Sequence, residues 1–104
     1  MRIIVFETAE ERAVGLQNRR YIEEETLFLF AEIGPGDTFH SQNVPEPFDL
    51  AFLDGGGRVL VVYGMRPPHD LVEAPPGAVR ALEAKGGRMA RWGIVNGSVV
   101  SVAP

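Results

Sequence analysis

A small set of polar residues in this sequence could bind a ligand or transfer a proton. The set comprises Arg19, His40, Gln42, Asn43, Asp49 and Glu83. An arginine offers a planar fork for a carboxylate or phosphate, and an asparagine amide offers both a donor and an acceptor. Two carboxylates can bind sugar hydroxyls or act as an acid and a base. We therefore hypothesise that the set converges on one pocket, with Asp49 and Glu83 as the candidate catalytic residues.

The same residues also admit a purely structural interpretation. Arg19 and Asp49 could form an ion pair, and Asn43 could bridge backbone groups at the bend that Pro45 and Pro47 impose. Buried polar side chains must be paired, and in a small domain they often pair with one another. The sequence alone leaves the structural network and the binding pocket both open.

Other catalytic and metal-binding patterns find little support in the sequence. The chain has no cysteine, and His40 and His69 are not at a metal-ligand spacing, so no metal site is predicted. Ser41 follows His40 but lacks a G-x-S-x-G elbow. The glycines at 55–57 lead into a strand rather than a helix, which indicates a hairpin turn instead of a phosphate-binding loop. No cofactor is predicted.

Short apolar segments separated by glycine and proline must position these side chains. The segments expected to form strands are residues 2–7, 26–31, 38–42, 48–53, 58–63, 78–84 and 98–102. Residues 26–31 are apolar at nearly every position, so this strand is expected to be buried on both faces. The loop around His69 and Asp70 is expected to have no regular structure.

The sequence predicts one main helix. Thr8-Ala9-Glu10-Glu11 is a capping box, so the helix is expected to begin after Thr8 and to run through Gly15 toward Arg19 and Arg20. A single helical turn is expected at residues 87–92. The predicted fold class is mainly β (α+β): one domain over residues 1–104, with about six to seven short strands in a barrel-like arrangement, an N-terminal helix and a short C-terminal helical turn.

The composition restricts the partners of the protein. The chain has 104 residues, a net charge of −4, 45% hydrophobic and 23% charged residues, which is typical of a soluble globular domain. A negative net charge argues against nucleic-acid binding, which needs a concentrated positive surface. No apolar run approaches the roughly 18 residues of a membrane span, and the N-terminal apolar run is too short for a signal peptide. We expect a cytoplasmic protein without membrane contact.

Several blocks in this chain match, in order, the pattern of a known family. The blocks are Gly15–Arg19, Thr26–Phe28, Phe39–Asp49, Ala51–Asp54, Leu82-Glu83 with the nearby Gly87, Gly93-Ile94 and Gly97-Ser98. The central block aligns without a gap on Phe-Trp-Met-Lys-Asn-Thr-x-x-Pro-Leu-Asp. The chain thus resembles the bacterial and archaeal domain-of-unknown-function family 192. The resemblance implies a compact β-barrel-like domain and brings no established activity.

The chain departs from that pattern around the central asparagine. His40, Ser41, Gln42 and Val44 stand where the family usually has Trp, Met, Lys and Thr, so the cation at this place is lost. If the lysine recognises an anion in relatives, His40 or Arg19 replaces it here, or the ligand has changed.

Three functional hypotheses follow from the sequence. The first is a small non-enzymatic binding domain whose pocket takes a small polar ligand, a sugar or an anion. The second is a hydrolase or transferase with Asp49 and Glu83 as acid and base. The third is a protein-protein interaction module or homo-oligomer that uses the acidic loop at residues 23–25 and the arginines near the C-terminus.

Overall fold

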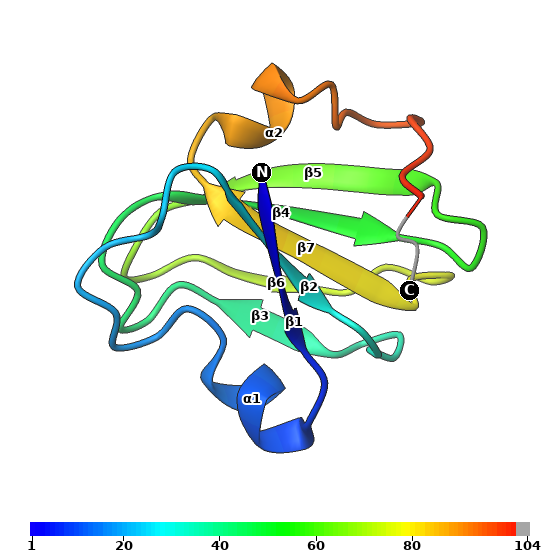
Figure 1. Ribbon diagram of the computed structural model, residues 1–104. Helices are drawn as coiled ribbons and strands as arrows, with labels where there is room; N and C mark the ends of the chain where they lie inside the picture. The colour runs from blue at the N-terminus through cyan, green and yellow to red at the C-terminus, as the bar shows by residue number, and fades with distance from the viewer. Residues whose placement is uncertain (102–104) are drawn as a thin grey trace.

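Two β-sheets and two short helices make up the protein (Figure 1). The computed structural model describes residues 1–101. The elements in chain order are β1 (Arg2–Phe6), α1 (Ala9–Val14), β2 (Thr26–Phe30), β3 (Thr38–His40), β4 (Phe48–Leu53), β5 (Val59–Met65), β6 (Leu71–Glu73), β7 (Arg80–Lys85) and α2 (Arg88–Arg91). No helix within residues 1–101 is long and apolar enough to cross a membrane.

The larger sheet has the strand order β1-β2-β7-β4-β5, and β3 pairs with β6 in a separate two-stranded sheet. Strands β1 and β2 are parallel, and the other pairs are antiparallel. Figure 1 shows α2 over one face of the larger sheet, with α1 and the β3–β6 sheet on the opposite side. The larger sheet is therefore the middle layer of the molecule.

Each face of this middle layer carries its own apolar core. Successive strand residues point to opposite faces, so Phe28 and Phe30 join one cluster while Leu27 and Leu29 join the other. Every residue of β2 is buried, as its continuous apolar sequence predicts. The predicted mainly-β class, with its N-terminal helix and C-terminal helical turn, is confirmed.

The sheets do not close into the expected barrel. Strands β1 and β5 are the two edges of the larger sheet. The β5 edge is partly covered by the chain after α2, since the Gly97 amide donates to the Val59 carbonyl at 2.8 Å and the Val59 amide donates to the Ser98 carbonyl at 2.8 Å. The chain thus protects this edge with an irregular segment rather than by closure.

The first helix is shorter than predicted. The capping box is present, because the Glu11 amide donates to the Thr8 hydroxyl at 3.0 Å and the Glu11 carboxylate accepts from the Thr8 amide at 3.0 Å. The helix ends at Val14, and Gly15 leaves it with φ 52°. A Cβ at Gly15 would lie 3.4 Å from the Phe30 ring, so the glycine allows the chain to turn closely over β2.

Two other segments differ from the prediction. The loop around His69 and Asp70 leads into β6, a three-residue strand whose Leu71 is exposed and which gives no apolar pattern to recognise. Within residues 98–101 the expected last strand is reduced to one antiparallel bridge between Arg58 and Val99. Residue 102, the end of that predicted strand, lies outside the described residues.

Gly57 is the contact point between the β4–β5 hairpin and the C-terminal segment. Its φ is 84°, and a Cβ there would overlap the Val100 carbonyl oxygen. Gly57→Ala is expected to destabilise the fold by about 2 kcal/mol, because the backbone is strained and the C-terminal segment is pushed away. Gly55→Ala is the matched control, since a Cβ at Gly55 meets nothing within 4 Å. Equal urea midpoints for the two variants would contradict this prediction.

Candidate functional site

Glu83 lies at the centre of the larger sheet, on the face toward α1 and β3. Its β7 position pairs with Phe28 on one side and Leu50 on the other. The residue is only 4% exposed, and among the described residues its carboxyl group has no hydrogen-bond or ionic partner. Burial raises the pKa of Glu83 from 4.5 to about 8, because the apolar surroundings disfavour the charged form.

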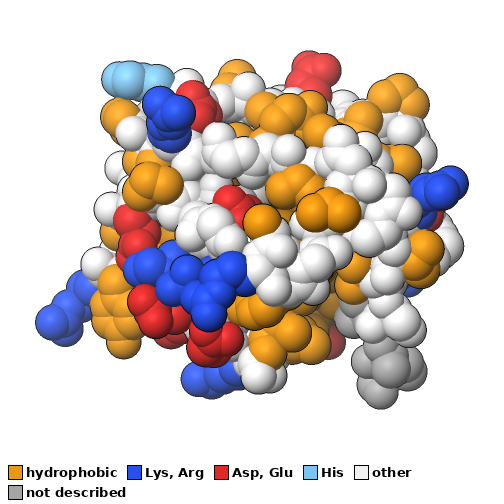
Figure 2. Space-filling view, turned by 90° about the horizontal axis from the view of Figure 1, so that it is seen from above, with side chains coloured by type: hydrophobic (Ala, Val, Ile, Leu, Met, Phe, Trp, Pro, Cys, Tyr) orange, Lys and Arg blue, Asp and Glu red, His pale blue; other side chains and the backbone are white. Residues whose placement is uncertain are grey.

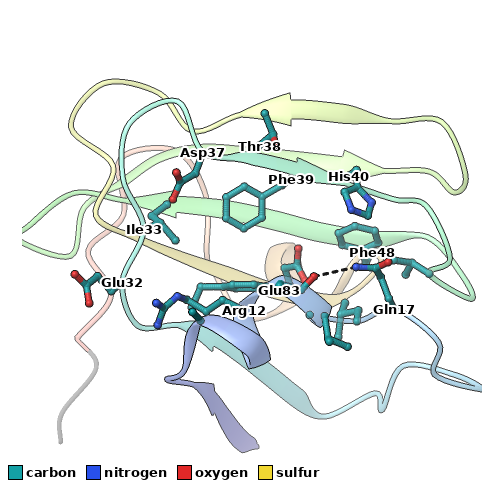
Figure 3. Close-up of a pocket in the computed structure, with 17 residues that line it drawn as sticks. Arg12, Gln17, Glu32, Ile33, Asp37, Thr38, Phe39, His40, Phe48 and Glu83 are labelled. Atoms are coloured by element: carbon teal, nitrogen blue, oxygen red, sulfur yellow. Dashed lines mark hydrogen bonds between the residues drawn. The ribbon is translucent and has the colours of Figure 1, made fainter.

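A cavity of about 370 Å³ opens onto Glu83 (Figure 3). It lies between α1 with the turn that follows it, the chain from Glu32 through β3, and the middle sheet. The aromatic residues Phe30, Phe39 and Phe48 line it together with polar side chains. The polar lining residues are Arg12, Gln17, Glu32, Asp37, Thr38, His40 and Glu83. A concave site that combines aromatic side chains with converging polar groups can bind a small ligand.

The polar lining is richer in acceptors than in free donors. Arg12 donates to the Glu7 carbonyl, and in Figure 3 its guanidinium extends to the side of the cavity where Glu32 lies. The Gln17 side-chain nitrogen donates to the Ala13 carbonyl at 3.0 Å, the bond that Figure 3 marks. An Asp37 oxygen accepts from the Gly34 amide at 2.8 Å, which fixes this carboxylate at the cavity wall. The arrangement suits a ligand that brings hydrogen-bond donors.

The family model for DUF192, described as "Uncharacterized ACR", matches residues 1–102. The chain belongs to DUF192. No curated protein gives a significant match.

Solved structures of two bacterial proteins share the DUF192 fold seen here. One is a protein of unknown function from Novosphingobium aromaticivorans DSM 12444, with 28% identity and a TM-score of 0.83, over 96% of this chain and 74% of that one. The other is a candidate transcription regulator from Sinorhizobium meliloti 1021, with 21% identity and a TM-score of 0.79, over 93% of this chain and 78% of that one. The second likeness concerns the fold alone.

Of the sequence-predicted site residues in this DUF192 chain, only His40 and Glu83 line the cavity. Asp49 lies on the opposite face of the sheet, because it neighbours Leu50, the cross-strand partner of Glu83. Its carboxylate accepts from the Met89 amide at 3.1 Å and so holds the start of α2. The structure therefore does not bring the two candidate catalytic carboxylates together.

Arg19 does not pair with Asp49 as the structural interpretation expected. It pairs with Glu23 at 3.1 Å, and its guanidinium carbon lies 4.7 Å from the centre of the Phe28 ring. Arg19 therefore covers the edge of the core rather than the cavity, and the predicted Arg19–Asp49 ion pair is wrong.

Asn43 lies in the backbone turn that precedes Pro45 and Pro47. It has φ 63°, a left-handed conformation that asparagine tolerates, and its carbonyl accepts from the Asn18 amide at 2.9 Å. The Val44 amide donates to the Ser41 carbonyl at 3.2 Å, which closes a tight turn around Gln42 and Asn43. Asn43 thus connects the DUF192 central block to the turn after α1 through its backbone carbonyl, whereas the structural interpretation expected its side chain to make the bridge.

Gln42 lies on the outer side of the same turn. Its amide donates to His40 Nδ1 at 3.2 Å, and both residues border a shallow depression with Pro68, His69 and Leu71. Residues 1–101 contain no group of three or more histidine, cysteine or acidic side chains that could hold a metal ion. His40 is the one predicted residue that borders both hollows.

The acidic loop and a C-terminal arginine contact each other within the chain. Arg88 pairs with Glu24 at 3.2 Å, and Figure 2 shows arginine or lysine and acidic side chains gathered together at one side of the α2 face. Glu46 links the loop after α1 to β7, because its carboxylate accepts from the Ile22 amide at 2.8 Å and from the Lys85 side chain at 2.6 Å. The bond from Lys85, with that from Ile22, holds the pKa of Glu46 below its ordinary value. These charges stabilise the loop after α1 against the sheet.

Sequence reasoning missed most of the cavity wall. Arg12, Gln17, Glu32 and Asp37 reach it from α1 and from the loops after α1 and β2. No spacing in the sequence relates these residues to Glu83, because the loops are brought over β7 by tertiary packing. The one signal that was available is that Phe39 and Phe48 lie near the two ends of the central block of the family pattern, and both line the cavity.

Proposed function

We propose that this protein is a small binding domain that holds a small polar ligand in the cavity above Glu83. The observation that carries the proposal is a carboxyl group that is 4% exposed, without a partner in the described residues, and at the wall of an open cavity. Buried polar groups in proteins are normally paired, so an unpaired one at a cavity is a candidate for ligand contact.

The lining favours one of the two ligand classes predicted from the sequence. Glu32, Asp37 and Glu83 supply carboxyl groups, and the Arg12 guanidinium is bonded to a carbonyl. An anion would meet repulsion from Glu32 and Asp37, whereas a ligand with hydroxyl or amino groups would find acceptors. The aromatic rings would contact its carbon atoms. A sugar, a polyol or an amine therefore fits better than an anion.

The enzymatic alternative loses its geometric support. A hydrolase or transferase that used Asp49 and Glu83 would need both carboxyl groups near one substrate, and the two lie on opposite faces of the sheet. The binding function does not need that pair.

Ligand-induced changes in amide NMR spectra test the proposal. Glucose, glycerol, butylammonium chloride and sodium butyrate are each added to the labelled protein. We expect at least one donor-bearing probe to shift the amides of residues 37–40 and 83, with no similar effect on residues 95–99 on the other side of the sheet. A screen in which no probe shifts the cavity residues selectively would refute the binding function.

A further inference from the structure

We propose, building on the binding function above, that the ligand of this cavity is a small organic cation, a primary ammonium group on a short apolar chain, and that Glu83 is the residue that binds the ammonium group. The cavity is of suitable size, since about 370 Å³ accommodates a small amine but not a macromolecule.

The position of Glu83 provides the first argument. The carboxyl group lies at the floor of the cavity, between Phe28 and Leu50 on the neighbouring strands. In such apolar surroundings an ion pair is much less screened than in water. A bound ammonium group would supply the partner that Glu83 lacks among the described residues, and would donate up to three hydrogen bonds.

The aromatic lining provides the second argument. Phe30 and Phe39 meet edge to face, with ring centres 5.3 Å apart, and Phe48 also lines the cavity. Aromatic rings attract cations through their negative faces and also contact the alkyl part of an amine. The carboxyl group would thus bind the ammonium group of an alkylammonium ion, and the aromatic rings would contact its alkyl chain.

The charged groups around Glu83 provide the third argument. Glu32 and Asp37 line the cavity from the loop after β2, Arg12 from α1, and His40 from β3. Arg19, which lies over the ring of Phe28 on the adjacent strand, is paired with Glu23. Glu32 and Asp37 together outnumber the one guanidinium at the cavity. The local field therefore attracts cations.

Binding of a cation by Glu83 must release a proton. The pKa of Glu83 is raised to about 8 by burial, so the free protein holds the proton at pH 7. The ammonium ion keeps its own proton up to about pH 10, near the value for lysine. Binding at pH 7 should therefore release close to one proton from Glu83 to the buffer. Affinity should rise about tenfold per pH unit up to about pH 8 and then level off.

Isothermal titration calorimetry with butylammonium chloride tests this inference. The titration is run at pH 6, 7, 8 and 9, and at pH 7 in two buffers with different ionisation enthalpies to count released protons. Butanol and sodium butyrate are matched probes without the positive charge. We expect the ammonium ion to bind more tightly than both, with proton release and with the rise in affinity below pH 8.

Two variants test whether Glu83 is the residue that binds the ammonium ion. Glu83→Gln should weaken ammonium binding about 10- to 100-fold, since a charge-assisted bond is lost, and should remove the pH dependence. Glu73→Gln removes an acid on the exposed strand β6 and should leave binding unchanged. Circular dichroism spectra of both variants are needed to check that they are folded.

The outcomes separate this inference from the binding function. Binding of butanol or glucose at the cavity without binding of butylammonium would overturn the cation assignment and leave the binding function standing. Butylammonium binding that does not depend on pH or on Glu83 would overturn the role of Glu83. If no probe binds at the cavity, both proposals fail.

Discussion

Glu83→Gln is expected to make the protein more stable at neutral and alkaline pH, by about 3 kcal/mol at pH 7 and about 5 kcal/mol above pH 8. The pKa of Glu83 is 4.5 before burial and about 8 in the fold, so the folded protein keeps a proton that the unfolded chain has lost. Stability is then fully present below pH 4.5 and falls as the pH rises toward 8. Glutamine has no such proton, and its amide resembles the neutral carboxyl group in size.

Urea unfolding at pH 5, 7 and 8.5 measures this effect. The free energies of unfolding of the wild type and Glu83→Gln should be similar at pH 5 and should separate progressively at the higher pH values. Glu73→Gln is the matched control, because its carboxyl group is exposed on β6 and its loss should leave the slope unchanged. Parallel curves for wild type and Glu83→Gln would contradict the raised pKa.

A stability cost at this position agrees with a functional role. Most of the core around Glu83 is apolar, with Phe28, Phe48 and Leu50 fully or almost fully buried. An apolar side chain in the middle of β7 would complete that core without a desolvation penalty. Residues that lower stability in this way are characteristic of binding sites, where local rules for a stable fold are broken.

The individual strands and the capped helix could be predicted from local patterns. The way in which the edges of the sheet are protected could not. The capping box at Thr8 predicts the start of α1, and the continuous apolar run of β2 predicts a buried strand, because both patterns depend on residues near in sequence. The end of α1 at Gly15 depends on the approach to Phe30, which lies on another element. Likewise, the β5 edge is covered through hydrogen bonds between Val59 and residues 97–98, a long-range contact without a sequence pattern.

Two residues of the candidate site could be named from the sequence, and the others could not, for the same physical reason. Glu83 and His40 are polar residues beside apolar ones, and both line the cavity. Asp49 also stands among apolar residues, but strand alternation places it on the far side of the sheet from Leu50 and Glu83. The face to which a polar residue points depends on strand register as well as on its neighbours. The loop residues Glu32 and Asp37 could be placed only by the three-dimensional fold.

Ser41 holds the β3–β6 sheet to the loop between β5 and β6. Its side chain is fully buried, donates to the Arg66 carbonyl at 2.8 Å and accepts from the Asp70 amide at 2.9 Å. The Ser41 amide also donates to the Asp70 carbonyl at 3.0 Å. Because His40 precedes Ser41 in the chain, this anchor also fixes one wall of the cavity.

Ser41→Ala is therefore expected to lower the free energy of unfolding by about 3 kcal/mol, since two backbone groups lose a buried partner. Ser98→Ala is the matched control: its hydroxyl also makes two backbone bonds, to the Val95 amide at 3.0 Å and the Val95 carbonyl at 2.7 Å, but in an exposed turn where water can replace it. That variant should lose less than about 1 kcal/mol. Hydrogen exchange of the Asp70 amide should accelerate in Ser41→Ala and stay unchanged in Ser98→Ala. Equal losses of stability in the two variants would show that burial of the Ser41 hydroxyl does not set the strength of this anchor.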